Sequence, residues 1–189
     1  MLSVKDLFKH YLGLEPNASQ VFTSLISLPW SFKIFYGLVA DNFPIWGSRR
    51  RSYVILNGLV QTMTLWALAL HVVEDAVFVT TMLFLNSLNS AFLDVVVDAL
   101  MVTQSRKDPE HGSEDLQGLS WSLLAIGGIL GAICSAFFTE YLQPFHTFLA
   151  CSFFSMLIVV AGYYINPEVE TQMRDSSFDG DMQPIGFVK

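Results

Sequence analysis

The sequence predicts an all-α polytopic membrane protein. Apolar residues make up 52% of the 189-residue chain and charged residues only 14%, well below the quarter expected of a soluble domain. The mean hydropathy is +0.47. The apolar residues also gather into runs of about twenty, the length that a helix needs to cross a bilayer. The runs predict five spans, at about 20–40, 54–73, 76–103, 118–142 and 145–165.

Residues 1–19 precede the first predicted span and are too short and too charged to cross a membrane. Their apolar residues could form one helical face, which Gly13 and Pro16 would end. They also lack the continuous apolar core of a signal peptide. We expect this segment to be the outer end of a truncated first helix.

Span 20–40 contains two residues that are unusual inside a membrane helix, Pro29 and Lys33. Proline has no amide hydrogen to donate, so Pro29 should kink the helix and shape its packing. Lys33 is the one basic residue that the sequence predicts deep within a span.

The segment 37–53 fixes the orientation, because it holds Arg49, Arg50 and Arg51 between two apolar runs. Three arginines cannot lie in hydrocarbon, and short arginine-rich loops remain in the cytoplasm. The turns after the second and fourth spans contain no Lys or Arg. The polar and acidic composition of residues 166–189 predicts a cytoplasmic tail or linker.

The third span carries polar residues at every fourth position, which places them on one slowly rotating stripe of a helix. They are Asn86, Ser90, Asp94 and Asp98. A carboxylate near mid-bilayer costs roughly 3 kcal/mol, so two on one face need a water-filled cavity, a cationic partner or protons. The functional interpretation is a substrate or ion pathway with a protonated aspartate. The structural alternative is a charge pair between helices.

Lys33 is the natural counter-charge for these aspartates. It could bind an anionic group of a substrate, pair permanently with Asp94 or Asp98, or extend along its stem to the interface. The sequence leaves these choices open. We expect Lys33 to face the third span.

The fourth span has small residues at helical spacing, Gly127, Gly128 and Gly131, which would let another helix approach closely. Helix packing is the expected role. Both cysteines fall inside apolar runs, without the spacing of a metal site or a disulfide framework.

No catalytic, cofactor or metal motif is visible, and a net charge of −7 argues against a nucleic-acid partner. We therefore expect no enzyme. An enzyme using Asp94 and Asp98 as acid and base would need a nucleophile or a metal ligand, and the sequence offers none.

The segment Gly37-x-x-Ala40-Asp41, followed by Gly47-x-Arg49-Arg50, resembles the loop between helices two and three of the major facilitator superfamily. Its longer form here, Asp-x-x-Pro-Ile-aromatic-Gly-x-Arg-Arg, is similar to the folate–biopterin transporter family. Segments 27–33, 94–99 and 116–128 resemble the second, fourth and fifth helices of that family, in the same order.

This resemblance implies a major-facilitator-type helical bundle in which the chain supplies helices two to six of the N-terminal half. It implies a membrane secondary transporter of folate or pterin-like solutes, with proton coupling. Lys33, Asp94 and Asp98 would be the charges for substrate or proton coupling. The cytoplasmic gate motif would comprise Gly37, Asp41, Gly47, Arg49, Arg50 and Arg51.

The substrate of this fold lies between two halves. The resemblance therefore predicts that the chain is a fragment that lacks the C-terminal half, with membrane lipid and a small molecule as its other partners. The plasma membrane and the plastid envelope fit equally well.

The sequence departs from the family pattern at Ile34, where a second proline is expected, and at Leu123 and Leu124, where relatives often have a smaller or basic residue. Substrate identity is thus left open. Two alternatives remain: a carrier of a different small solute, and a truncated membrane protein that acts only by interaction.

Overall fold

The computed structural model describes residues 7–43, 45, 50–70, 75–105, 111–141 and 144–165. Its elements are helices, which confirms the predicted all-α bundle. In chain order they are η1 (Leu7–Tyr11), α2 (Pro16–Ser27), η2 (Leu28–Phe32), α3 (Lys33–Asn42), α4 (Arg51–Leu70), α5 (Ala76–Ser105), α6 (Gly112–Tyr141) and α7 (Pro144–Tyr164). The tail 166–189 lies outside the described residues.

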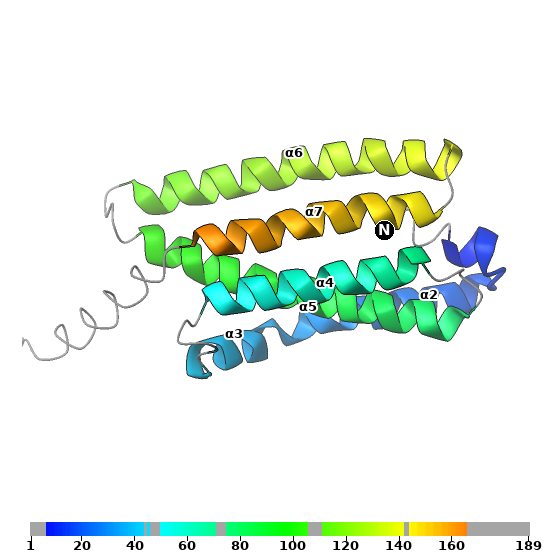
Figure 1. Cartoon of the computed structure of the whole chain (residues 1–189), viewed down its shortest axis with the longest axis horizontal. Helices are drawn as coiled ribbons and strands as arrows, with labels where there is room; N and C mark the ends of the chain where they lie inside the picture. Colours follow the sequence, from blue (N-terminus) through cyan, green and yellow to red (C-terminus); the bar gives the residue numbers. More distant parts are fainter. Residues whose placement is uncertain are drawn as a thin grey trace, which may run out of the picture.

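Among the described residues, five helical stretches are long and apolar enough to cross a membrane, which agrees with the predicted number of spans. They are Pro16–Asn42, Arg51–Leu70, Ala76–Ser105, Gly112–Phe138 and His146–Tyr164. The long helices lie side by side along one direction (Figure 1). Helix α6 begins at Gly112 rather than near 118, and the acidic Glu114 and Asp115 in its first turn suit the positive end of the helix dipole.

The first span loses α-helical geometry around Pro29, where the sequence predicts a kink. Helix α2 ends at Ser27, and the tighter 3-10 turn η2 carries the chain to Lys33, where α3 begins. The hydroxyl of Tyr36 donates a hydrogen bond to the Pro29 carbonyl across 3.0 Å. This bond occupies a backbone acceptor that regular α-helical bonding would otherwise use.

Helices α4 and α7 approach each other most closely at two single glycines. A Cβ atom added to Gly58 would lie 2.9 Å from Val159 Cγ2, and one added to Gly162 would lie 2.9 Å from Ile55 Cγ1. Real Cβ atoms essentially never approach so closely. The close packing of these two helices therefore depends on glycine at both positions.

The glycines Gly127, Gly128 and Gly131 of α6 are in a different situation. A Cβ atom added at any of them would meet no described atom within 4 Å. Their predicted role in helix packing is therefore not filled by any described part of the chain. The role remains a prediction for another helix.

The short turn η1 packs against the end of the bundle. Leu7 and Phe8 are fully buried and form one cluster with Leu68 of α4, Val79 of α5 and Phe148 of α7. The side of η1 that the sequence predicts to be apolar thus joins three spans at one end.

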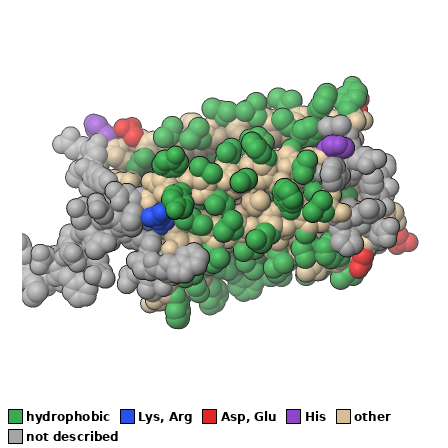
Figure 2. Space-filling view, in the orientation of Figure 1, with side chains coloured by type: hydrophobic (Ala, Val, Ile, Leu, Met, Phe, Trp, Pro, Cys, Tyr) green, Lys and Arg blue, Asp and Glu red, His purple; other side chains and the backbone are tan. Residues whose placement is uncertain are grey.

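The visible long face of the bundle is covered mainly by apolar side chains, whereas acidic, basic and histidine side chains lie near its two ends (Figure 2). Helix α6 is exposed along most of its length, including Ile126, Ile129 and Ile133. This distribution is the one that hydrocarbon around the spans requires.

Candidate functional site

An ion pair joins the first and third spans. The Lys33 ammonium nitrogen donates a hydrogen bond to Asp94 Oδ2 across 2.5 Å. The prediction that Lys33 faces the third span is confirmed, and Asp94 is its partner. The ammonium also lies 4.5 Å from the centre of the Trp30 ring, where the negative face of the ring attracts it.

The pair opens into a cavity of about 480 Å³ between the first span, α5 and α6. The Lys33 and Asp94 side chains keep 37% and 34% of their surface exposed, so both remain accessible from this cavity. Asp98 lies one turn further along α5 and lines the same cavity. The cavity therefore holds two carboxylates and one ammonium group.

Helix α6 contributes the opposite wall. Its lining residues are Ser113, Leu116, Gln117, Ser120, Trp121 and Leu124. None of the polar members of this set was predicted as a site residue from the sequence. The signal was present, because positions 113, 117, 120 and 124 recur at the three- and four-residue spacing of one helix face.

A row of aromatic rings holds the first span against α5 and α4. Tyr36 stacks on Phe92 with ring centres 5.5 Å apart, and Phe92 stacks on Tyr53 at 5.2 Å. The Tyr53 hydroxyl then donates a hydrogen bond to the Phe43 carbonyl across 2.7 Å. These contacts fix the rotation of α3 that directs Lys33 toward Asp94.

The polar stripe of α5 divides between two neighbours. Ser90 accepts a hydrogen bond of 3.2 Å from Gln61 Nε2 on α4, whereas Asp94 and Asp98 face the cavity. The reason is geometric: each four-residue step advances about 40° around the helix, so Asn86 and Asp98 differ by about 120°. Asn86 Oδ1 and Gln61 Oε1 are buried without a hydrogen-bond partner among the described residues.

Three gate-motif residues, Asp41, Arg50 and Arg51, lie at the end of the bundle where α3, α4 and α5 meet. Arg50 Nη1 donates hydrogen bonds to the Ala99 carbonyl, at 3.0 Å, and to Thr103 Oγ1. Arg51 lies 5.1 Å from the ring centre of Tyr163. Asp41 is exposed near the end of α3, and the described ion pairs do not include it.

Two further gate residues, Gly47 and Arg49, lie outside the described residues. Gly37 is described, and a Cβ atom added there would make an ordinary 3.5 Å contact with Val95 Cγ1. Space alone therefore does not demand glycine at position 37.

The arrangement suits reversible binding of charge. An ammonium group and two carboxylates in one accessible cavity can exchange partners with an anionic solute or with protons. The described residues contain no group of three or more His, Cys, Asp or Glu side chains that could hold a metal ion.

Comparisons with known proteins agree on one family. The model of the BT1 family matches residues 1–184. A folate-biopterin transporter of Synechocystis is 34% identical over 90% of this chain and 34% of its own length. A probable folate-biopterin transporter 4 of Arabidopsis thaliana is 32% identical over 71% of this chain and 28% of its own length.

A more distant relative is folate transporter 1 of Plasmodium falciparum, which is 26% identical over 87% of this chain and 32% of its own length. The chain thus spans about a third of the length of the curated relatives it matches. No solved structure matches it.

Proposed function

The chain belongs to the BT1 family, and from this membership we propose that it forms part of a proton-coupled secondary carrier of folate or pterin-like solutes. It is a multi-pass integral membrane protein with five helices that can span the bilayer. The relatives named for such transport support the solute class. In this proposal the described bundle supplies helices two to six of an N-terminal half.

The observation that carries the proposal is the Lys33–Asp94 pair beside Asp98 in one cavity. An unpaired charge at this depth is costly, so Lys33 needs a carboxylate at every stage of a cycle. Without solute, Asp94 supplies it. When a solute carboxylate enters and binds the ammonium group, the released Asp94 is best neutralised by a proton.

Asp98 provides a second carboxylate within the same cavity. Two neighbouring carboxylates resist being charged together, which favours the uptake of one proton by the pair. Trp30 and Trp121 offer flat aromatic faces on the cavity wall, against which a planar pteridine ring could stack. Solute recognition in this proposal combines a carboxylate on Lys33 with ring stacking.

The test is a chimera in which this chain replaces the matching segment of the Synechocystis relative, assayed in vesicles for uptake of labelled folate and biopterin. We expect uptake that rises with an imposed proton gradient and is lost in Asp94→Asn and in Lys33→Gln. A chimera that inserts and transports either solute equally well with both substitutions would refute the assigned roles.

A further inference from the structure

A second cavity, of about 450 Å³, lies at the end of the bundle that carries Arg50. It is lined by Arg50, just before α4, and by residues of α5, α6 and the end of α7, and it does not include Lys33, Asp94 or Asp98. Its lining residues are Arg50, Val97, Leu100, Met101, Thr103, Gln104, Leu116, Ala161, Tyr164 and Ile165. We call it the Arg50 crevice.

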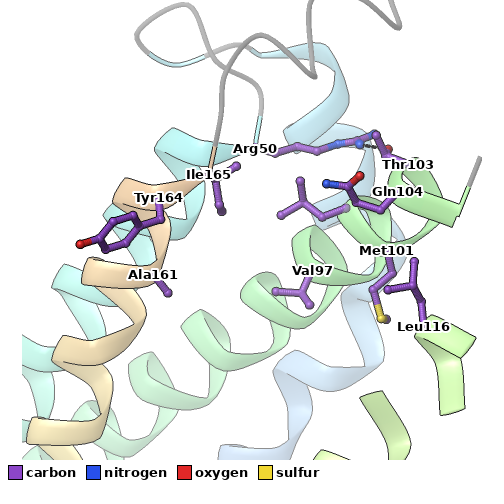
Figure 3. Close-up of a pocket in the computed structure, with 10 residues that line it drawn as sticks. Arg50, Val97, Met101, Thr103, Gln104, Leu116, Ala161, Tyr164 and Ile165 are labelled. Carbon is purple, nitrogen blue, oxygen red and sulfur yellow. Dashed lines mark hydrogen bonds between the residues drawn. The ribbon is translucent and has the colours of Figure 1, made fainter. Parts of the chain in front are cut away.

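The polar side chains of the Arg50 crevice gather toward one end, where Ile165 also lies. Figure 3 shows Arg50, Thr103 and Gln104 toward one end, and Val97, Ala161 and Met101 toward the other. Among the described residues of the lining, Arg50 is the one that carries a charge. A ligand that fits must therefore carry an anionic group at one end and an apolar body at the other.

The position of the crevice along the bundle indicates which amphiphilic molecules surround it. The C-terminal ends of α5 and α7 and the start of α4 meet at this end, beside Arg50 and Arg51. Arginines flanking spans mark the cytoplasmic face. Tyr163 and Tyr164 are exposed at the same level, as is typical of the membrane–water interface. Anionic headgroups of the inner leaflet lie at this depth.

We propose that the Arg50 crevice binds one anionic phospholipid of the cytoplasmic leaflet. The phosphate accepts hydrogen bonds from the guanidinium group, which has five N–H donors and uses Nη1 for Ala99 and Thr103. One acyl chain lies along Val97, Met101 and Ala161. The crevice is large enough for such a segment, since its volume falls within the usual range for small-ligand sites.

Arg51 provides the matched control. It is the next residue, it carries the same charge, and it lies over Tyr163 rather than in the lining of the crevice. General attraction of the anionic membrane surface would depend equally on both arginines. Binding at a specific lipid site in the crevice depends on Arg50 and not on Arg51.

The experiment titrates the chain in detergent micelles with phosphatidylglycerol and, separately, with phosphatidylcholine of the same acyl chains, and counts bound lipids by native mass spectrometry. We expect one phosphatidylglycerol to bind about tenfold more tightly than phosphatidylcholine, because both lipids offer a phosphate to Arg50 but the choline ammonium cancels the net negative charge of phosphatidylcholine. Arg50→Gln should remove this preference, and Arg51→Gln should keep it.

Ala161→Phe supplies a second variant, which fills the apolar part and leaves the bonds of Arg50 in place. Ala161→Phe should weaken the binding of both lipids. It also provides a test if Arg50→Gln fails to fold. Equal affinity for the two lipids, equal effects of Arg50→Gln and Arg51→Gln, or full binding by Ala161→Phe would each overturn the proposal. Displacement of the lipid by an equal concentration of inorganic phosphate would also overturn it, because it would indicate a site for free anions.

Discussion

Lys33 and Asp94 are 61 positions apart in the chain, yet the Lys33 ammonium nitrogen lies 2.5 Å from Asp94 Oδ2 and joins the first span to the third. The pair connects the interrupted first span to the longest polar stripe of the bundle. Because both side chains are also exposed to a cavity, the same contact can contribute to stability and to solute binding.

The pair should couple energetically. Asp94→Asn or Lys33→Gln alone leaves one unpaired charge within a span and should lower the free energy of unfolding by about 1–2 kcal/mol, less than for a fully buried pair because about a third of each side chain is exposed. The double substitution should cost about 1 kcal/mol less than the sum of the two. Unfolding in mixed micelles of increasing SDS content measures all three, and strictly additive effects would contradict the pairing.

Asp98 should matter for proton coupling more than for stability. Asp98→Asn removes a carboxylate from the cavity without breaking the Lys33–Asp94 bond. We expect the chimera described above to keep solute binding and to lose its response to a proton gradient. Glu15→Gln is the control, since Glu15 is exposed before α2 and makes no capping bond through its side chain. An unchanged gradient response in Asp98→Asn would assign the coupling to Asp94 alone.

Glycine positions should differ sharply in their tolerance of alanine. Gly58→Ala places a methyl group 2.9 Å from Val159 Cγ2 and 3.3 Å from the Val159 backbone nitrogen, and should cost about 1–3 kcal/mol. Gly128→Ala meets no described atom within 4 Å and should stabilise α6 by up to about 1 kcal/mol. The same SDS titration compares them. Equal effects at both sites would argue against the α4–α7 contact.

Phe8 should act as an anchor for the end of the bundle. It is fully buried against Leu68, Val79 and Phe148, so Phe8→Ala should cost about 3 kcal/mol. Phe35→Ala is a matched control, because Phe35 is 61% exposed and loses few protein contacts. Protease protection of residues near Tyr11 would report whether η1 still packs, and unchanged protection in Phe8→Ala would exclude an anchoring role.

The charged centre was largely predictable from sequence, because a lysine and two aspartates inside apolar runs are costly unless they meet. The choice of Asp94 as the partner was not. Asp94 and Asp98 share one stripe, and the ring contacts of Phe92 with Tyr36 and Tyr53 set which of them faces Lys33. Those contacts come from three separate positions in the chain and have no local signature.

Helix packing was harder to predict than charge. The spacing of Gly127 and Gly131 is a familiar packing pattern, yet both face open space among the described residues. The tight contacts use Gly58 and Gly162, each an isolated glycine among larger residues. An isolated glycine is informative only when its partner helix is known, and pairing of α4 with α7 depends on the whole fold.

The α4–α7 contact also constrains the order of assembly. Helix α7 is the last described span to leave the ribosome, whereas α4 is made three spans earlier. Until α7 arrives, the face of α4 around Gly58 has no partner to fit its groove, and lipid chains or an insertion chaperone must cover it. Closure of the described bundle thus waits for α7, and a ribosome stalled before Pro144 would leave α4 inserted but open to capture by quality-control proteases.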